Sequence, residues 1–575
     1  MQFMRIKSGI LFLLLCGIPF LLLAGAEVAL RTIGYGQDYA LFIPCPDKES
    51  GTYIINSRFY ARNFSGEIKK SVENAPAWGM PLQQKKKEGT FRIFVLGGSV
   101  ALGDVPEQAF NIPRYLEVML QASFPGTHFE IHNLACFALG SPVMRDAAEQ
   151  AAAFSPDLFC VYMGNNEYVG NFLSRWFQGS RLRSAAEMRL LFKLQQCRLL
   201  QLAQSFYPEF EDPLLASWSS YFKNAFPLAP NSSGREQMYW NYASNLHDIY
   251  ASAQRAGTGM LVCSVAANIA AMPPLGSVHR TDLTESEKEQ WDHYFSTACA
   301  LMPEQPALAL EHFREALEID DTFALLHFHM GECFLLLKQF AEAKKSFQCA
   351  CDFDAHPVRA DSRINAVIRQ LVKMERESGI LFADVEKNFS DAAESGVIGQ
   401  EYCYDYVHLN LEGNYQVASM IFDAIKDFVA QKTGRSPVKE KLDYPTASRY
   451  LGLSPLLELK CIDAMLEEQE RFRVLFPDYL PGRYALVKQK AEAALPESAV
   501  DDALEAIDSA LEIRGEDLQL RRLRCEILWD AGRAKEMHQE AQKILAHFGD
   551  TPLGAFTGRL FISAENQEED IENTH

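Results

Sequence analysis

Five short runs of β-forming residues, separated by helical patterns, constrain the fold of this chain more than any other feature. Turn residues bound each run, and helical patterns such as residues 240–255 lie between them. This alternation is typical of a parallel sheet covered by helices on both faces. In such sheets the functional loops follow the carboxyl ends of the strands. The runs are Phe91–Leu96, Phe129–Leu134, Leu158–Met163, Met260–Val265 and Ile380–Val385.

The composition is that of a globular protein and limits the partners of the chain. Hydrophobic residues make up 48% of its 575 residues, a length that requires more than one domain. The formal net charge is −20. A surface this acidic repels phosphate backbones, so we expect no nucleic-acid partner. The cysteines and histidines lack the spacing of a metal site, and we expect neither a metal nor another cofactor.

The amino terminus carries an apolar run long enough to cross a membrane. Residues 8–26 are uncharged, and Arg5 and Lys7 precede them. About 20 such residues span ~30 Å of hydrocarbon, and the flanking cations favour a cytoplasmic amino end. We expect residues 1–30 to form a signal anchor that crosses the membrane once and leaves the bulk of the chain on the exported side, periplasmic or extracytoplasmic. The alternative is a secretory signal cleaved after Ala24-Gly25-Ala26.

The segment 283–355, between the fourth and fifth runs, repeats a helical pattern. Two alanines and a phenylalanine recur 34 residues later: Ala309, Phe313 and Ala316, then Ala343, Phe347 and Ala350. The period and the residue types resemble the tetratricopeptide repeat, which implies a protein partner. The alternative is two ordinary amphipathic helix pairs.

The segments outside these regions are less informative. Residues 31–90 lack clear periodicity, and we interpret them as a linker and lead-in. Residues 440–575 have helical patterns throughout and contain a weaker form of the repeat at Ala503, Ile507 and Ala510. We expect this region to be helical and similar to tetratricopeptide repeats.

The first run leads into Gly97-Gly98-Ser99-Val100, which is compatible with several kinds of site. A phosphate-binding loop is excluded, because Asp104 stands where that loop needs a lysine and its carboxylate would repel phosphates. Three interpretations remain: the nucleophile elbow of α/β-hydrolases, a serine nucleophile in another hydrolase layout, or a simple turn before a helix.

Three further loops place polar groups after predicted strands. Gly140 follows the second run, Asn166 follows the third, and Asp405 and His408 lie after the fifth. A serine, amide donors and a paired aspartate and histidine are the groups that acyl transfer requires.

In this order the blocks resemble those of the SGNH/GDSL hydrolase superfamily. The resemblance implies an α/β fold, a flavodoxin-like three-layer parallel sheet, with residues 91–282 and 356–432 as the two parts of the hydrolase domain. The short spacing between Asp405 and His408 argues against an α/β-hydrolase, in which the acid and the histidine come from separate loops.

The resemblance also implies a role for each residue. Ser99 is the nucleophile, His408 is the general base, and Asp405 orients the imidazole. The backbone N–H groups of Ser99 and Gly140 and the side-chain amide of Asn166 form the oxyanion hole.

Two blocks depart from the superfamily pattern. The usual Gly-Asp-Ser-Leu block reads Gly97-Gly98-Ser99-Val100, and Glu167 replaces the aspartate that usually follows the asparagine. Neither change removes a group that makes or breaks bonds, but both indicate a divergent branch.

We therefore expect a membrane-anchored, exported serine esterase that hydrolyses an acyl ester, such as an O-acetylated carbohydrate, through an acyl-enzyme. One alternative is an O-acyltransferase with the same triad. Another is an envelope scaffold that has lost catalysis and works through its helical repeats. The basic, amphipathic segment Arg183–Phe206 is predicted to lie over the site or against the membrane surface.

Overall fold

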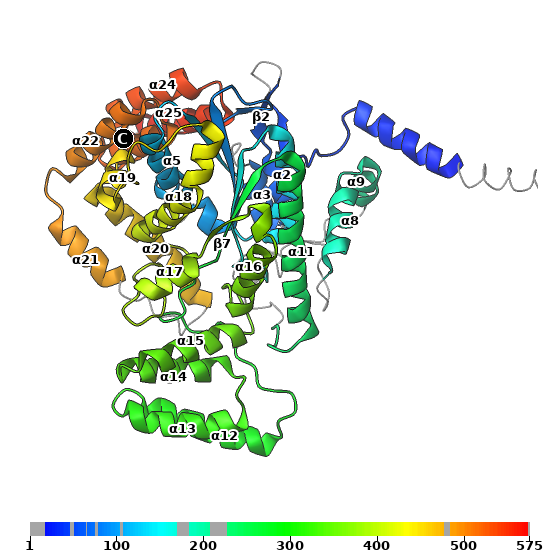
Figure 1. The fold of residues 1–575 in the computed structure, drawn as a ribbon. Coiled ribbons are helices and arrows are strands. Elements are labelled where there is room, and N and C mark those ends of the chain that lie inside the picture. Colours follow the sequence, from blue (N-terminus) through cyan, green and yellow to red (C-terminus); the bar gives the residue numbers. More distant parts are fainter. Residues whose placement is uncertain are drawn as a thin grey trace, which may run out of the picture.

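A parallel five-stranded sheet forms the centre of the molecule (Figure 1). The computed structural model describes residues 18–45, 51–64, 66–74, 79–103, 107–168, 183–206, 227–475 and 484–572. The strand order is β5-β4-β6-β7-β8, the order of flavodoxin-type doubly wound sheets. The strands are β4 (Thr90–Gly97), β5 (His128–Asn133), β6 (Leu158–Tyr162), β7 (Gly259–Cys263) and β8 (Leu381–Ala383). The five predicted strands and the parallel α/β sheet are confirmed.

Strand β4 lies between β5 and β6, and all eight of its residues are buried. Val95 of β4 is level with Asn133 on one neighbour and with Cys160 on the other. Because the three strands end at the same edge, the loops that follow them meet there. Burial on both faces explains why these strands are continuous apolar runs.

Helices cover both faces of the sheet. One face carries α6 (Ser141–Ala151), α11 (Ser233–Ala256) and α16 (Ser362–Met374), and the other carries α5 (Ile112–Ser123) and α18 (Leu411–Thr433). Figure 1 shows α11 on one side of β7 and α18 on the other. Asn410 caps the start of α18, since its side chain accepts from the N–H of Gly413, and Gly434 ends the helix in a left-handed conformation.

The described residues between 31 and 90 include folded elements that the interpretation as a linker and lead-in did not anticipate. They contain a small antiparallel sheet whose buried residues, Phe42 and Ile55, join the main hydrophobic core. Its elements are too short to show periodicity in the sequence. They are β1 (Phe42–Pro44), β2 (Thr52–Ile55), α2 (Ser57–Ala61), α3 (Gly66–Asn74) and β3 (Leu82–Gln83).

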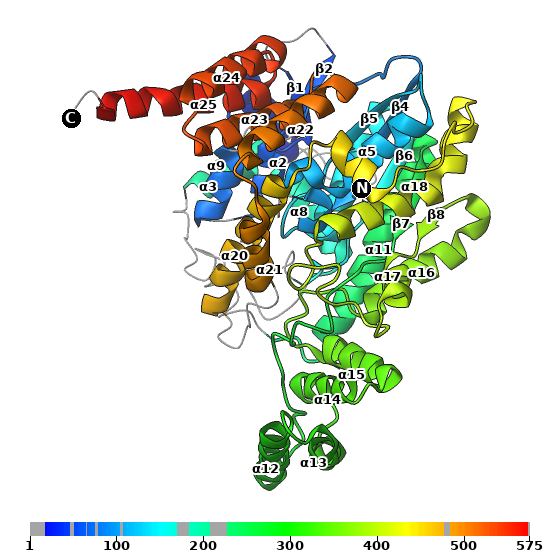
Figure 2. The same ribbon diagram turned by 90° about the vertical axis from the view of Figure 1, so that its left-hand side faces the viewer.

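Two helical hairpins, inserted in the sequence between β7 and β8, project from the sheet domain (Figure 2). They consist of α12 (Glu285–Leu301) with α13 (Pro306–Ile319) and of α14 (Ala324–Leu336) with α15 (Phe340–Phe353). The residues that repeat in the sequence are buried in a separate core of these helices. A Cβ on Gly331 would lie 2.8 Å from the ring of Phe347, so a small residue is needed there. The hairpins are the helix pairs that the pattern predicted; their identity as tetratricopeptide repeats stays a prediction.

The carboxyl-terminal region is helical, as predicted, and packs against the sheet domain. Arg114 on α5 forms an ion pair with Asp517 at 2.6 Å, and Glu117 pairs with Arg514 at 2.8 Å. The helices are α19 (Tyr444–Tyr450), α20 (Pro455–Leu475), α21 (Tyr484–Ala494), α22 (Ala499–Arg514), α23 (Leu518–Asp530), α24 (Ala534–Phe548) and α25 (Pro552–Glu572).

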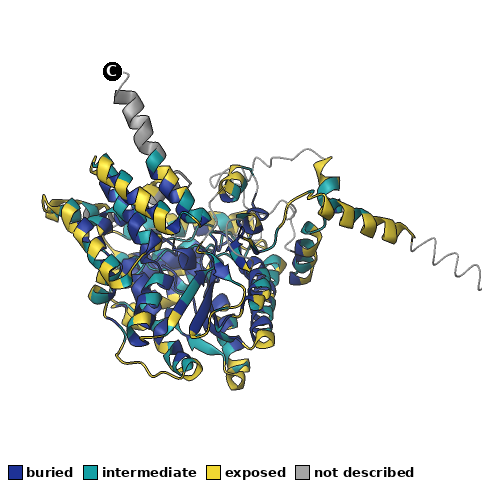
Figure 3. Ribbon diagram, turned by 90° about the horizontal axis from the view of Figure 1, so that it is seen from above, coloured by how far each residue is buried: buried dark blue, intermediate teal, exposed yellow. Residues whose placement is uncertain are grey.

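Residues 18–32 form a helix that extends away from the body and is exposed along most of its length (Figure 3). Beside its base lie α8 (Ala185–Gln195) and α9 (Arg198–Ser205). Within the described part of the chain, no helix combines the length and the apolar character that a membrane crossing requires. The predicted anchor, residues 1–30, falls partly outside the described residues, which begin at residue 18.

Candidate active site

Ser99 lies at the sharp turn between the interior strand β4 and the short helix α4 (Ser99–Leu102). Two glycines precede it because neighbouring groups leave no room for a side chain. A Cβ on Gly97 would lie 2.3 Å from the carbonyl oxygen of Tyr162, and one on Gly98 would lie 2.3 Å from Nδ2 of Asn166. The Gly97-Gly98 pair therefore holds the strand close to β6 and brings the serine beside Asn166.

Asp405 and His408 share a tight turn just before α18. The carboxylate oxygen Oδ1 of Asp405 accepts from the backbone N–H groups of Val407 at 2.8 Å and of His408 at 2.7 Å. The carbonyl oxygen of His408 accepts from the N–H of Tyr404 at 2.8 Å. These bonds explain the three-residue spacing, because the turn folds the imidazole back over the carboxylate.

The three side chains form one hydrogen-bonded chain. His408 Nδ1 lies 2.6 Å from Oδ2 of Asp405, and His408 Nε2 lies 2.8 Å from Oγ of Ser99. The Asp405 side chain is 5% exposed and that of His408 is 13% exposed. The structure thus brings together Ser99, His408 and Asp405, which come from opposite ends of the sheet domain.

The charge of Asp405 determines which ring nitrogen of His408 carries the proton. Burial acts to raise the pKa of the Asp405 carboxyl, but the His408 ring and the two backbone N–H groups outweigh it, so the pKa lies below its ordinary value. An ionised Asp405 accepts a hydrogen bond from the Nδ1–H of His408. Nε2 is then free to accept the hydroxyl proton of Ser99, which is the arrangement that a general base requires.

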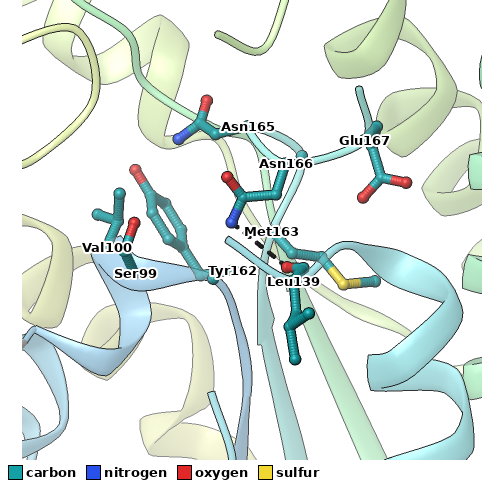
Figure 4. Close-up of a pocket in the computed structure, with 10 residues that line it drawn as sticks. Ser99, Val100, Leu139, Tyr162, Met163, Asn165, Asn166 and Glu167 are labelled. Carbon is teal, nitrogen blue, oxygen red and sulfur yellow. Dashed lines mark hydrogen bonds between the residues drawn. The ribbon is translucent and has the colours of Figure 1, made fainter. Parts of the chain in front are cut away.

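Two of the three residues predicted to form an oxyanion hole, Ser99 and Asn166, line a small pocket (Figure 4). Asn166 lines the pocket, and its Nδ2 donates to the carbonyl oxygen of Leu139 at 3.3 Å. Gly140 follows Leu139 in the chain and is the N-cap residue of α6; it does not itself line the pocket. A Cβ on Gly140 would lie 2.8 Å from the carbonyl oxygen of Asn166, so the two loops touch through their backbones.

The pocket beside Ser99 is narrow. Its volume is about 10 Å³, which is room for about one water molecule. Leucine, methionine and tyrosine side chains form part of its wall. The lining residues are Gly98, Ser99, Val100, Leu139, Tyr162, Met163, Gly164, Asn165, Asn166 and Glu167.

Glu167 has a structural role at the start of α6. In the sequence it stood out only because it replaces the usual aspartate. Its side chain accepts from the N–H of Ser141 at 2.9 Å and from the hydroxyl of Ser141 at 2.6 Å. Asn245 donates to the same hydroxyl at 3.0 Å. Burial raises the pKa of Glu167 to about 7, although the two bonds from Ser141 lower it. Glu167 therefore fixes the start of α6, and with it the position of Gly140.

Two further residues support the site and gave no sequence signal. The side chain of Asn165 is held by a backbone contact, since its Oδ1 accepts from the N–H of Ala360 at 2.8 Å. The buried Arg359 donates to the carbonyl oxygen of Asn268 at 2.9 Å, and its guanidinium lies 5.1 Å from the ring centre of Tyr406. Both contacts join the segment after the hairpins to the loops that carry Asn166 and Asp405.

Known proteins offer distant likenesses to this chain. No protein-family model and no curated protein sequence matches it. Among solved structures, it is similar to an acetylxylan esterase from Geobacillus stearothermophilus, with 11% identity over 58% of this chain and 94% of the other and a TM-score of 0.27. A GDSL-like lipase from Bacteroides thetaiotaomicron shows 10% identity over 60% and 93% of the two chains, with a TM-score of 0.27. An α/β hydrolase enzyme from the metagenome of Lake Arreo, Spain, shows 12% identity over 58% and 94%, with a TM-score of 0.26.

Proposed function

We propose that the chain is a membrane-anchored, exported serine esterase that hydrolyses a short acyl ester, such as an O-acetylated carbohydrate, through an acyl-enzyme. The observation that carries this proposal is the hydrogen-bonded chain from Asp405 through His408 to Ser99. It ends at the edge of a parallel sheet where the strand loops meet, next to amide donors.

The first half of the reaction transfers the acyl group to the enzyme. Ser99 Oγ attacks the ester carbonyl carbon while His408 Nε2 takes the hydroxyl proton. The carbonyl oxygen becomes an oxyanion, which the N–H groups of Ser99 and Gly140 and Nδ2 of Asn166 stabilise. The carbon–oxygen bond to the alcohol then breaks, and the imidazolium of His408 protonates the leaving alkoxide. Asp405 stays ionised and stabilises the imidazolium.

The second half returns the enzyme to its starting state. His408 takes a proton from a water molecule, whose oxygen attacks the acyl carbon on Ser99. The second tetrahedral intermediate uses the same donors, and its collapse releases the carboxylic acid and reprotonates Ser99. An acceptor alcohol in place of water would make the same site an acyltransferase.

The size of the pocket supports a short acyl group. Room for about one water molecule beside Ser99 fits the methyl group of an acetyl ester. A long acyl chain has no room between the described lining residues of this pocket. We therefore place acetyl esters first among the substrates and regard a carbohydrate as the alcohol part.

The amino-terminal helix supports the membrane anchor. Its apolar side chains are exposed instead of packed: Phe20 is 75% exposed and Leu21 is 73% exposed. Exposed side chains of this size on a nearly uncharged helix fit a lipid environment better than water. In this proposal residues 1–30 anchor the chain, and the sheet domain lies on the exported side of the membrane.

The inserted hairpins support a role in binding a protein partner. They pack around a core of their own, with Trp291, Phe313 and Phe347 buried in it, and they stand apart from the sheet (Figure 2). A surface built this way can bind a partner without disturbing the residues around Ser99.

The test is the turnover of chromogenic acyl esters by the detergent-solubilised full chain. Acetyl, butyryl and octanoyl esters are compared for the wild type and for Ser99→Ala. We expect turnover by the wild type, a fall in kcat/KM with acyl length, and loss of turnover in Ser99→Ala. A preference for the octanoyl ester would refute the short-acyl proposal.

The same assay separates the alternatives. Formation of an acylated alcohol in place of free acid, when a sugar acceptor is added, would identify an acyltransferase. A folded chain that turns over none of the esters, with or without the acceptor, would contradict both catalytic functions and leave the scaffold.

A further inference from the structure

The helix of residues 18–32 is fixed to the start of α9 by polar contacts. The carboxylate of Glu27 accepts from the N–H of Arg198 at 3.1 Å and from the N–H of Leu199 at 2.9 Å. Arg31 donates to the carbonyl oxygen of Gln196 at 2.7 Å. Burial acts to raise the pKa of Glu27, but its hydrogen bonds outweigh this effect and lower the pKa to about 2. The Glu27 carboxylate therefore stays charged. The orientation of the amino-terminal helix is therefore tied to α8 and α9.

Helix α8 has one face packed on the protein and another that is apolar and exposed. Met188 and Phe192 are buried, whereas Leu190 is 58% exposed and Leu194 is 41% exposed. The pattern continues past α8, where Phe206 is 78% exposed. We call Leu190, Leu194, Leu200 and Phe206, together with the exposed Lys193, the α8–α9 patch.

The charge around the α8–α9 patch is opposite in sign to that of the whole chain. Residues 183–206 carry four basic side chains and one carboxylate, in a protein with a net charge of −20. The basic residues are Arg183, Arg189, Lys193 and Arg198. Arg189 is paired with Asp248 at 2.6 Å, Arg198 is buried and Arg183 is half-buried, whereas Lys193 is exposed between the leucines. Leucines with a lysine among them are typical of a helix that lies in a membrane interface.

The position of the amino-terminal helix places a bilayer beside this patch. The continuous run of large exposed apolar residues on that helix ends at Leu23, with Val28 also exposed beyond it, and Glu27, one turn after Leu23, already contacts α9. A bilayer that holds residues 18–23 therefore has its surface within about one helical turn, ~5 Å, of the start of α9. The apolar patch, the anchor and the local positive charge point to the same partner.

We propose that α8 and α9 lie in the surface of an anionic bilayer, with Leu190, Leu194, Leu200 and Phe206 at the boundary between headgroups and acyl chains and Lys193 on the lipid phosphates. This proposal rests on the membrane anchor of the proposed function. Because α8 packs on α6, which begins next to Gly140, the contact also holds the edge of the sheet that carries Ser99 at a fixed height above the membrane.

Amide hydrogen exchange of the full chain tests the surface. The chain is compared in detergent, in phosphatidylcholine vesicles and in vesicles that also contain phosphatidylglycerol. We expect residues 185–206 to exchange several-fold more slowly in the vesicles than in detergent, and most slowly with phosphatidylglycerol present. Equal exchange in all three would overturn the proposal, as would protection that appears in detergent when the protein concentration is raised, which would indicate a second copy.

Matched variants identify the side chains that matter. Leu190→Glu with Leu194→Glu removes apolar groups from an exposed face, so we expect the fold and the vesicle association to remain while the protection is lost. Lys193→Glu is expected to abolish the difference between the two lipid compositions. The control is Leu336→Glu on α14, where the leucine is 62% exposed, and it should keep the protection. Protection that survives the double substitution contradicts the proposal.

Failure of the membrane-surface proposal can be distinguished from failure of the proposed catalysis and from failure of the proposed anchor. Turnover of a soluble acetyl ester by the same samples reports on Ser99 alone. A chain that turns over ester but shows no protection refutes the membrane surface and leaves the esterase. A chain that does not associate with vesicles at all refutes both the anchor and the patch.

Discussion

His408 Nε2 lies 2.8 Å from Ser99 Oγ, although 309 positions of the chain separate the two residues. The serine follows β4 and the histidine precedes the last helix of the sheet domain, with the helical hairpins between them in the sequence. Packing of α5 against α18 closes this distance, since α5 follows the serine loop and α18 follows the histidine turn. The catalytic proposal therefore depends on the assembled sheet and not on any local segment.

Asp405→Asn should leave the fold intact and remove most of the activity. The asparagine keeps an oxygen for the N–H groups of Val407 and His408, but it lacks the charge that stabilises the imidazolium. In triads of this kind the loss is about 10⁴-fold in kcat. Steady-state kinetics on an acetyl ester measure it, with circular dichroism as the control for folding. Activity within a few-fold of the wild type would show that Asp405 does not act on His408.

Asn166→Ala should lower kcat by about 10²–10³-fold with a smaller change in KM, because an oxyanion donor acts in the transition state. The adjacent Asn165 is the matched control. Its side chain accepts from the N–H of Ala360, so Asn165→Ala should reduce the melting temperature more than kcat. Equal losses of kcat in the two variants would contradict the assignment of Asn166 to the oxyanion hole.

Gly98→Ala should act through Asn166. The new Cβ would lie 2.3 Å from Nδ2 of Asn166, so the amide has to move away from Ser99. We expect a loss of kcat of the same order as in Asn166→Ala. The double variant tests the mechanism, because two changes that remove the same donor are not additive. Losses that multiply in Gly98→Ala/Asn166→Ala would show that the glycine matters for another reason.

Glu167→Gln should change how stability depends on pH. The pKa of the buried Glu167 rises from 4.5 to about 7 on folding, so the folded state holds a proton between these values that the unfolded chain has lost. The contribution of this group to the free energy of unfolding therefore falls as the pH rises from about 4.5 to about 7, by about 3 kcal/mol in total. Above pH 7 the penalty is constant.

Glutamine carries no charge and can still accept from the Ser141 N–H and donate to its hydroxyl. Denaturant unfolding at several pH values should show that the variant lacks this fall. The free energy of unfolding of the variant, compared with that of the wild type, should therefore be higher at pH 8 than at pH 5. Parallel pH profiles of the two proteins would mean that Glu167 does not titrate in this range.

The strands of the sheet could be predicted from the sequence because burial on both faces makes each one a continuous apolar run, as in Phe91–Leu96. The site residues could be proposed because the ends of parallel strands meet at one edge, so Ser99, Asn166 and His408 were expected to be neighbours before any contact was known. The repeating alanines and phenylalanines predicted the inserted helix pairs for a similar reason, since they form the buried face.

The remaining features depend on contacts that have no local pattern. The small sheet of residues 42–83 is made of strands of two to four residues, too short for alternation to be visible. Glu167 and Arg359 act through partners far away in the chain. Glu167 bonds to Ser141, which in turn bonds to Asn245, and Arg359 bonds to Asn268. Their importance comes from burial, which a single sequence does not reveal for charged residues.

The most direct test of the account is covalent labelling of the full chain with a serine-directed fluorophosphonate, followed by mass spectrometry of the labelled peptide. The account predicts one adduct, on Ser99, that is absent in Ser99→Ala and forms much more slowly in His408→Ala. A folded chain that takes up no label, or one labelled at another serine with Ser99 untouched, would contradict it.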